Sequence, residues 1–163
     1  MAPYDNVDEH DEAILKLLQE NARHLSSGEI SEKIDLSASA VRKRIKKLED
    51  QGIIKGYSAD IDYEKSGHPM RMVLFCTAPI PERGDMVEEI LEIPGVVSVQ
   101  ELVTGDENLL IEVIGERDSD ITPVAEELLD LGLKITDEVL VRQHETSPFD
   151  GFVREETEDD NES

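Results

Sequence analysis

The chain is poor in cysteine, in aromatic residues and in long apolar runs. It contains one cysteine, Cys76, no tryptophan, and aromatic side chains at only 4% of its 163 positions. A single cysteine excludes an intramolecular disulfide and favours a reducing compartment. No stretch approaches the ~18 apolar residues of a membrane-spanning helix, and the first residues lack the basic and apolar parts of a signal peptide. We therefore expect a cytoplasmic protein.

Residues that perform catalysis or bind metals are also sparse. The four histidines are scattered, and none of them has a partner at the spacing of a metal site on a helix. Cys76 has no neighbouring histidine or acid that would activate its thiol, and no glycine-rich phosphate loop is present. The sequence therefore predicts neither an enzyme nor a metal or cofactor site.

Positive charge is scarce as well. The chain has 16 Lys and Arg against 39 Asp and Glu, a formal net charge of −23. Because the acidic residues are spread over both halves, they predict a strongly hydrated surface that suits a very salty cytoplasm. This composition favours a halophilic source.

One segment departs from this bias. Residues 37–55, SASAVRKRIKKLEDQGIIK, hold six basic and two acidic side chains, a local net charge of +4, whereas residues 66–163 hold 6 basic and 25 acidic side chains. In so acidic a chain, a local basic surface indicates contact with a polyanion such as DNA.

The first part of the chain predicts three helices followed by a strand. Apolar residues at helical spacing predict helices over residues 8–22, 28–34 and 37–52, and alternation predicts a strand over 57–63. Three helices, with a tight turn between the second and third, then extended chain, predict a winged helix-turn-helix domain over residues 1–63.

The third of these helices is amphipathic. Ser37 is suited to cap its first turn and Gly52 to end it. The face that carries Val41, Ile45 and Leu48 is apolar, and the opposite face is cationic.

The second half predicts a ferredoxin-like domain. Strands are expected over residues 70–78, 96–103, 109–114 and 133–141, and helices over 85–91 and 122–131. This βαββαβ order predicts an α+β sandwich with two helices on one face of an antiparallel sheet. The predicted boundaries are a linker at 64–69, the domain at 70–149, and an acidic, disordered tail at 150–163. Because apolar side chains point to both faces of the sheet, we expect a second subunit to cover the open face.

Three separated motifs resemble the Lrp/AsnC family of transcriptional regulators, in the family's order. They are VDEHDEAILKLLQENAR, IDLSASAVRKRIKKLEDQGIIKGYSADID and IPGVVSVQELVTGDENLLIEV. The resemblance covers residues 7–149. It implies a DNA-binding domain joined to a ferredoxin-like domain that senses small molecules, commonly amino acids, and assembles into dimers or larger even homo-oligomers. With the acidic composition, it favours a haloarchaeal source.

The resemblance places the third helix in a major groove of double-stranded DNA. We expect Ser37, Ser39, Ala40 and Lys43 near base edges, and Arg42, Arg44, Lys46 and Lys47 near phosphates. Two alternatives stay open. The basic residues are also compatible with a merely solvated helix face, and Arg44 lies next to the apolar stripe, where it can instead bind Glu12 or Asp11 of the first helix.

In the second domain, the loop at residues 104–108 resembles the family's glycine-containing effector loop. The expected effector residues are Gly105, Asp106 and Asn108, with Thr136 in the last strand. The family often has Asp where Asn108 stands, so the expected anchor for an ammonium group is missing here. The alternative is an ordinary polar β-turn, in which Gly, Asp and Asn are common.

Two other functions remain compatible with the sequence. Siroheme decarboxylases share the two-domain architecture, but the basic residues that such an enzyme needs in its second domain lie here in the third helix. A partner module that does not itself bind DNA is the other alternative, and the cationic helix argues against it.

Overall fold

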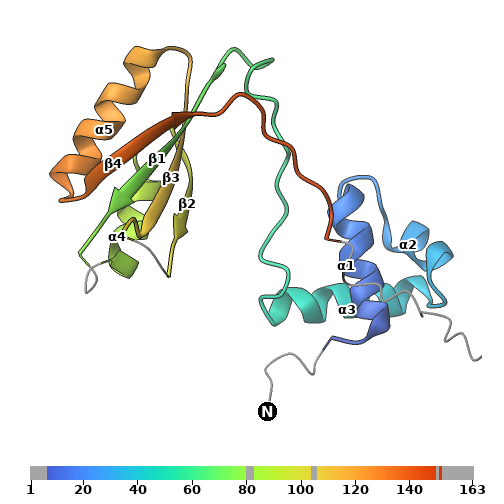
Figure 1. Ribbon diagram of the computed structural model, residues 1–163. Coiled ribbons are helices and arrows are strands. Elements are labelled where there is room, and N and C mark those ends of the chain that lie inside the picture. Colours follow the sequence, from blue (N-terminus) through green and yellow to red (C-terminus); the bar gives the residue numbers. More distant parts are fainter. Residues whose placement is uncertain (1–6, 80–82, 104–105, 150, 152–163) are drawn as a thin grey trace, which may run out of the picture. The chain divides into compact units, whose positions relative to one another are not determined.

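The computed structural model describes residues 7–79, 83–103, 106–149 and 151 (Figure 1). The chain forms two compact units, one of Met1–Ala59 with Glu145–Ser163 and one of Asp60–His144. Residues 145–149, assigned to the second domain from sequence, thus belong to the first unit, where the Phe149 N–H donates to Oε1 of Gln19 at 3.2 Å. The expected tail at 150–163 lies outside the described residues apart from Gly151.

The first unit contains the three expected helices. They are α1 (Glu9–Asn21), α2 (Ser27–Lys33) and α3 (Ala38–Asp50). Each helix begins at a side chain that accepts hydrogen bonds from backbone N–H groups of the first turn, namely Asp8, Ser26 and Ser37. These caps satisfy donors that have no partner within the helix, and this explains why the helices begin where the sequence predicts.

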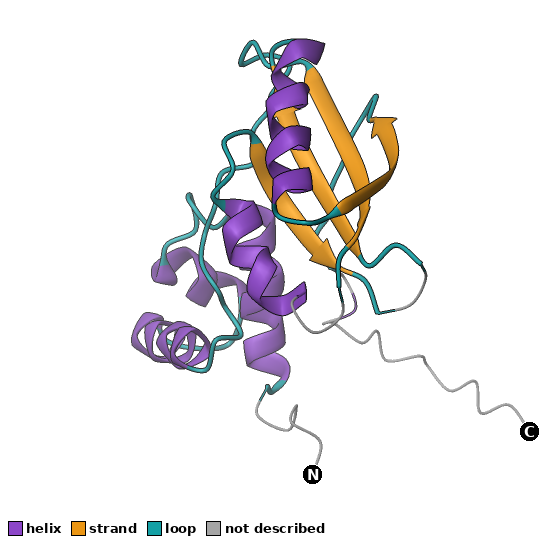
Figure 2. Cartoon of the chain, turned by 90° about the vertical axis from the view of Figure 1, so that its left-hand side faces the viewer, coloured by secondary structure: helices purple, strands orange, loops and turns teal. Residues whose placement is uncertain are grey.

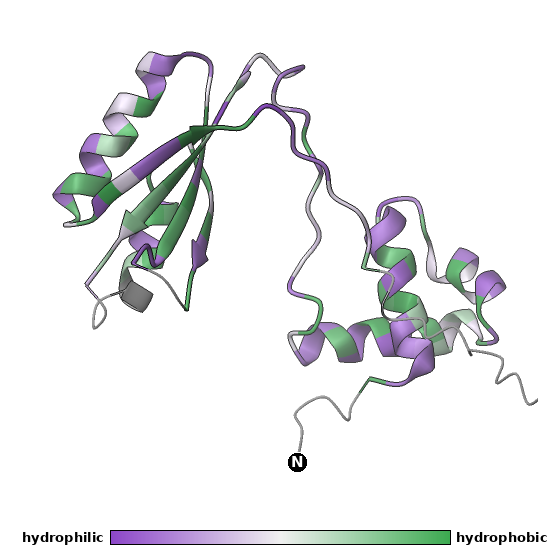
Figure 3. Ribbon diagram, in the orientation of Figure 1, coloured by the Kyte–Doolittle hydropathy of each residue, from purple (hydrophilic) through white to green (hydrophobic). Residues whose placement is uncertain are grey.

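The apolar stripes of the three helices meet in one core. Figure 3 shows apolar bands along α1 and α3 between hydrophilic ones. The buried residues of this core are Ile14, Leu15, Ile30, Val41 and Leu48. Because Val41 and Leu48 lie on one face of α3, the basic residues between them are turned toward solvent or toward the edges of this core.

Helix α3 ends at Asp50, and Gly52 follows just past its C-cap, Gln51, close to where the sequence places the helix end. The N–H groups of Gly52 and Ile53 donate to the carbonyls of Glu49 and Leu48, both at 2.9 Å, and Gly52 has a φ of +69°. This is the Schellman arrangement, in which glycine occupies the left-handed conformation just past the helix.

The prediction of a strand over residues 57–63 is wrong. Residues 55–62 have no regular secondary structure, and a turn follows at 63–67. Polar and apolar side chains do alternate here, but a strand also needs a neighbouring strand with which its backbone can form hydrogen bonds. Local contacts hold this segment instead, among them the hydrogen bond from the Tyr57 hydroxyl to Oε1 of Glu49 at 3.0 Å.

The second unit has the expected βαββαβ order, and Figure 2 shows a helix lying against the face of its sheet. Its elements are β1 (Met70–Thr77), α4 (Arg83–Leu91), β2 (Val96–Glu101), β3 (Leu109–Gly115), a 3₁₀ turn at Asp118–Asp120, α5 (Ile121–Asp130) and β4 (Lys134–Leu140). The strands lie in the order β2-β3-β1-β4, and all pairs are antiparallel. This confirms the ferredoxin-like topology.

Both helices cover the same face of the sheet. Leu74, Ile111 and Val113 form one buried cluster with Ile90 of α4 and Leu128 of α5. Cys76 belongs to this cluster, and burial raises the pKa of its thiol to about 11. The thiolate that would act as a nucleophile is therefore absent at neutral pH.

The other face of the sheet carries apolar side chains together with polar ones, such as Asp137 opposite Phe75 and Gln100 opposite Leu110. Val73 pairs with Val139 across β1 and β4, and Phe75 pairs with Leu110 across β1 and β3. In the same face, Arg71 forms an ion pair with Glu112, which also accepts a hydrogen bond from Ser98 at 3.2 Å. Val139 is 43% exposed, so this face is only partly covered within the chain.

Replacing Gly52 by Ala tests the end of α3. Nothing lies within 4 Å of a Cβ at this position, so the cost comes from the positive φ alone, about 1 kcal/mol of unfolding free energy. Gly28→Ala is the matched control, because Gly28 lies inside α2 with an ordinary φ, and Ala there should stabilise by about 0.5 kcal/mol. Chemical denaturation should show changes of opposite sign. Equal changes would contradict this account of the cap.

Candidate functional site

The basic residues of α3 are not equally accessible. Of the eight residues expected to contact DNA, two are half-buried, Ala40 and Arg44. The other six are exposed, namely Ser37, Ser39, Arg42, Lys43, Lys46 and Lys47. Helix α3 therefore brings all eight together around its first three turns, and it presents most of them to solvent.

Arg42 and Lys43 are the most available cations of the helix. Among the described residues, the side chain of neither forms a hydrogen bond or an ion pair. Lys46 lies one turn further on and pairs with Asp50, with Nζ 3.0 Å from Oδ1. Both side chains of that pair are more than 60% exposed, and such pairs contribute at most about 1 kcal/mol. Lys46 can therefore exchange Asp50 for another anion at little cost.

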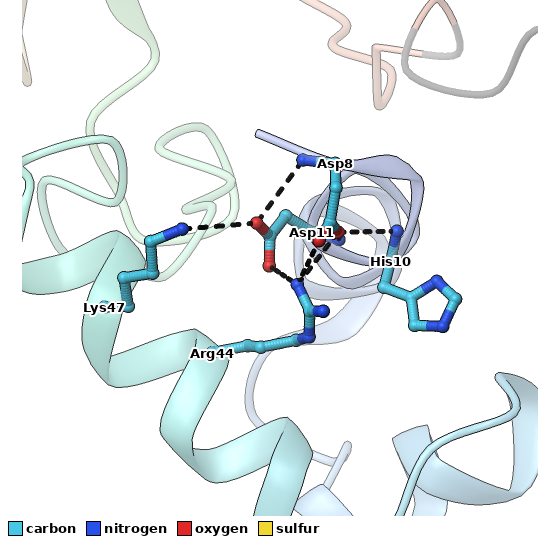
Figure 4. Close-up of polar contacts among 5 residues, drawn as sticks. All are labelled: Asp8, His10, Asp11, Arg44 and Lys47. Atoms are coloured by element: carbon cyan, nitrogen blue, oxygen red, sulfur yellow. Dashed lines mark hydrogen bonds and ion pairs between the residues drawn. The ribbon is translucent and has the colours of Figure 1, made fainter. Parts of the chain in front are cut away.

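Arg44 is bound to the first turn of α1 (Figure 4). Its Nη1 lies 2.7 Å from Oδ2 of Asp8 and 2.8 Å from Oδ1 of Asp11. Figure 4 shows the imidazole of His10 pointing away from this group. The brace to Asp11, one of the two alternatives left open by the sequence, is confirmed, and the second carboxylate is that of Asp8. No bond joins Arg44 to Glu12 in the part of the chain that the structure describes.

Asp11 is the fully buried member of this cluster, with 0% of its side chain exposed. An unpaired carboxylate in such a place would be very costly, and removing one partner of a buried ion pair typically costs about 3–5 kcal/mol. The hydrogen bonds from Arg44 to Asp11 and Asp8 raise the pKa of the guanidinium further above its ordinary value. Arg44 therefore stays charged and stays bound to Asp8 and Asp11.

Asp8 caps α1 while it binds Arg44. Its Oδ1 accepts the N–H groups of His10 and Asp11, both at 3.0 Å. The hydrogen bond from the Asp11 backbone, followed by those from Arg44, holds the pKa of the Asp8 carboxyl below its ordinary value of 3.8. The stability that Asp8 contributes is therefore present above that value and is lost as acid protonates the carboxylate.

Lys47 approaches the same cluster from the following turn. Its Nζ lies 4.0 Å from Oδ2 of Asp11 (Figure 4), and about half of its side chain is exposed. Two of the five cations of α3 are thus directed at acids of α1. This leaves the basic surface smaller than the sequence indicates.

In the second unit, Asn108 acts as a clip between two segments of the chain. It is buried, and its side-chain amide bonds both backbone groups of Ala78, donating to the carbonyl at 2.7 Å and accepting the N–H at 2.8 Å. Its own N–H donates to the Cys76 carbonyl at 3.0 Å. The side-chain amide of Asn108 is therefore used within the chain, which favours a structural role for this residue over contact with an effector.

The other expected effector residues are more accessible. Asp106 and Thr136 are exposed, and Gly105 lies outside the described residues. The backbone carbonyl of Asp106 accepts the hydroxyl of Thr77 at 2.9 Å, and the hydroxyl of Thr136 donates to the Phe75 carbonyl at 3.0 Å. Thr77 is the last residue of β1 and Phe75 lies two residues before it, so the structure brings Asp106 and Thr136 to the same end of this strand.

The sequence did not indicate that Thr77 and Ala78 bind the expected effector loop, or that Asp8 pairs with Arg44. Thr77 follows the alternation of β1 and was identifiable as a residue of the open face. Asp8 was expected only as a cap, because its pairing with Arg44 joins positions 36 residues apart.

Two further features bear on the class of protein. In the described ranges, no three His, Cys, Asp or Glu residues gather into a possible metal site. Within the same ranges, every helix is too short or too polar to cross a membrane.

Comparisons with known proteins find similarity for the N-terminal segment and for most of the chain. Residues 7–55 match the winged helix-turn-helix DNA-binding family. The chain is 36% identical to the HTH-type transcriptional regulator LysM of Saccharolobus solfataricus over 123 residues, 76% of this chain and 84% of that protein. It is 33% identical to the HTH-type transcriptional regulator LrpA of Pyrococcus horikoshii over 114 residues, 70% of this chain and 79% of that protein.

A solved structure with the same fold is that of a transcriptional regulator from Neisseria meningitidis in complex with L-methionine. It has a TM-score of 0.72 and 26% identity, and the match covers 87% of this chain and 94% of that one. The related proteins are named as regulators and not as enzymes, in agreement with the prediction that this chain is not an enzyme. Since these similarities extend over most of its length, the chain belongs to the Lrp/AsnC family of DNA-binding transcriptional regulators.

Proposed function

We propose that α3 is the recognition helix and enters the major groove of double-stranded DNA. Arg42 and Lys43 carry the proposal, because they are exposed neighbours for which the described part of the chain offers no acidic partner. In this arrangement Ser37, Ser39, Ala40 and Lys43 lie near base edges, while Arg42, Lys46 and Lys47 approach phosphates. The protein acts in the cytoplasm, where its DNA is.

We also propose that the chain works as a dimer or larger even homo-oligomer, joined through the open face of the sheet. The apolar pairs Val73–Val139 and Phe75–Leu110 supply a contiguous surface. A two-fold dimer presents two recognition helices to two half-sites about one helical turn apart.

The second unit is proposed to sense a small molecule, in particular an amino acid. The methionine complex of the Neisseria regulator supports this class of ligand. Here Asp106 and Thr136 are the available polar side chains, since the amide of Asn108 is occupied by Ala78. The acidic surface supports a further proposal, that the protein functions in the concentrated salt of a halophilic, haloarchaeal cell.

The double substitution Arg42→Gln and Lys43→Gln should weaken binding to a duplex enriched by the wild-type protein from random-sequence DNA. If both residues contact phosphates, the slope of log affinity against log salt should fall by about 1.8 for each subunit, or about 0.9 for each contact. A slope that falls by only about 0.9 indicates that one of the two residues contacts bases instead, as proposed for Lys43. Lys134→Gln, in β4, is the matched charge control and should bind as the wild type does.

If the double variant binds with unchanged affinity, α3 is not the DNA-contacting helix. If the wild-type protein itself enriches no sequence, the alternative of a partner module is favoured over a DNA-binding regulator.

Addition of an amino acid should raise the melting temperature of the protein if the second unit is a sensor. A ligand at one hundred times its Kd stabilises the folded state by about 2.7 kcal/mol. All twenty amino acids are tested, and Asp106→Asn should reduce the shift, since it removes a carboxylate that attracts an ammonium group. Asp118→Asn, in the 3₁₀ turn, is the control. A melting temperature that no amino acid changes contradicts this ligand class.

Val139→Asp should dissociate the oligomer, because it places a charge in the apolar face proposed to be the interface. Val139 is already 43% exposed, so the fold of the single chain should tolerate the change. Leu129→Asp, on α5 and 54% exposed, is the control and should keep the dimer. Light scattering after size-exclusion chromatography gives the mass. The opposite pattern would place the interface on the helices.

A further inference from the structure

If a basic residue of α3 bound a DNA phosphate, it would have to give up the acidic residue that it binds now. The cost of this exchange differs among the basic residues. Lys46 would leave Asp50, whose side chain is 64% exposed and is hydrated by solvent. Arg44 would leave Asp11, whose side chain is completely buried. The first exchange costs little. The second leaves the buried Asp11 carboxylate with only two longer contacts, to Nζ of Lys47 at 4.0 Å and to the Asp8 N–H at 3.4 Å, which is costly.

We propose that Arg44 positions the recognition helix and makes no contact with DNA. This inference rests on the proposed role of α3 and changes the role expected for Arg44 from sequence. The residue sits between exposed and buried positions of α3, with 28% of its side chain exposed, and its Nη1 reaches two carboxylates of α1 at 2.7 and 2.8 Å.

The direction of this contact explains what it contributes. The apolar stripe of Val41 and Leu48 holds α3 on the core, but apolar contacts are not directional and tolerate rotation of a helix about its axis. The bonds from Arg44 to Asp8 and Asp11 are directional. They fix the rotation of α3, and with it the direction in which Lys43, the preceding residue, leaves the helix.

The start of α1 is stabilised by the same group of atoms. Asp8 and Asp11 form a capping box, in which each side chain accepts the backbone N–H of the other residue. Asp8 therefore cannot move to follow Arg44 without opening the first turn of α1. The capped first turn of α1 therefore fixes the position of Arg44 in the protein without DNA.

The test compares Arg44→Gln with Arg42→Gln in the full-length protein. Affinity for the enriched duplex is measured over a range of salt concentrations, at a temperature well below the melting transition of either variant. Arg42→Gln should lower the salt slope by about 0.9 for each subunit. Arg44→Gln should lower the affinity by the same factor at every salt concentration. The slope of log affinity against log salt should therefore equal that of the wild type.

A second variant distinguishes positioning from direct contact. Asp11→Asn added to Arg44→Gln removes the buried charge and lets two amides bond each other, so it should recover part of the lost affinity and melting temperature. Glu9→Gln added to Arg44→Gln is the control, since it removes an equal charge from the exposed first turn of α1. This control should recover neither.

Each outcome decides the question. A salt slope that falls with Arg44→Gln as it does with Arg42→Gln makes Arg44 a phosphate contact and overturns the proposal. A lower melting temperature with unchanged affinity makes Arg44 merely stabilising and also overturns it. If the wild-type protein binds no duplex, it is the proposed role of α3 that fails, and this result is separate from any effect of Arg44.

Discussion

The buried carboxylate of Asp11 is the constraint on which the DNA-binding unit depends. A charge with no exposure to water must have a partner, and Arg44 is placed to supply it at 2.8 Å. The pairing joins the first turn of α1 to the middle of α3, and the same turn is capped by Asp8. One electrostatic requirement therefore determines where α1 begins, how α3 is rotated, and which basic residues of α3 remain for other partners.

This constraint matters more in an acidic chain. With a net charge of −23, the protein repels DNA as a whole, so attraction must come from a few local cations. Arg42 and Lys43 have no acidic partner in the described structure, whereas Arg44 is bound to α1 and Lys46 to Asp50. If binding uses so few phosphate contacts, its specificity must come from base edges rather than from net charge.

The sequence predicted the helices and the βαββαβ order because periodicity and capping are local properties of the chain. It did not correctly predict features that depend on a residue far away in the sequence. The strand expected over residues 57–63 has the right alternation but no neighbouring strand among the described residues. Asn108 was expected at an effector site, yet its amide bonds Ala78, which is 30 residues away. For Arg44 the sequence offered two roles, and only the fold, which places Asp8 and Asp11 beside it, favours one of them.

The two units differ in how their polar groups are used, and this bears on regulation. In the first unit the buried polar group is an ion pair that orients a helix. In the second, Asn108 ties the end of β1 to the hairpin between β2 and β3 through neutral hydrogen bonds. A ligand near Asp106 would act on a loop whose base is held by this clip and by the bond from Thr77. A ligand shifts an equilibrium only by its different affinity for two states. Of these hydrogen bonds, the one from Thr77 to the Asp106 carbonyl is exposed and those of Asn108 are buried, so the former is the one that a ligand at Asp106 can more easily affect.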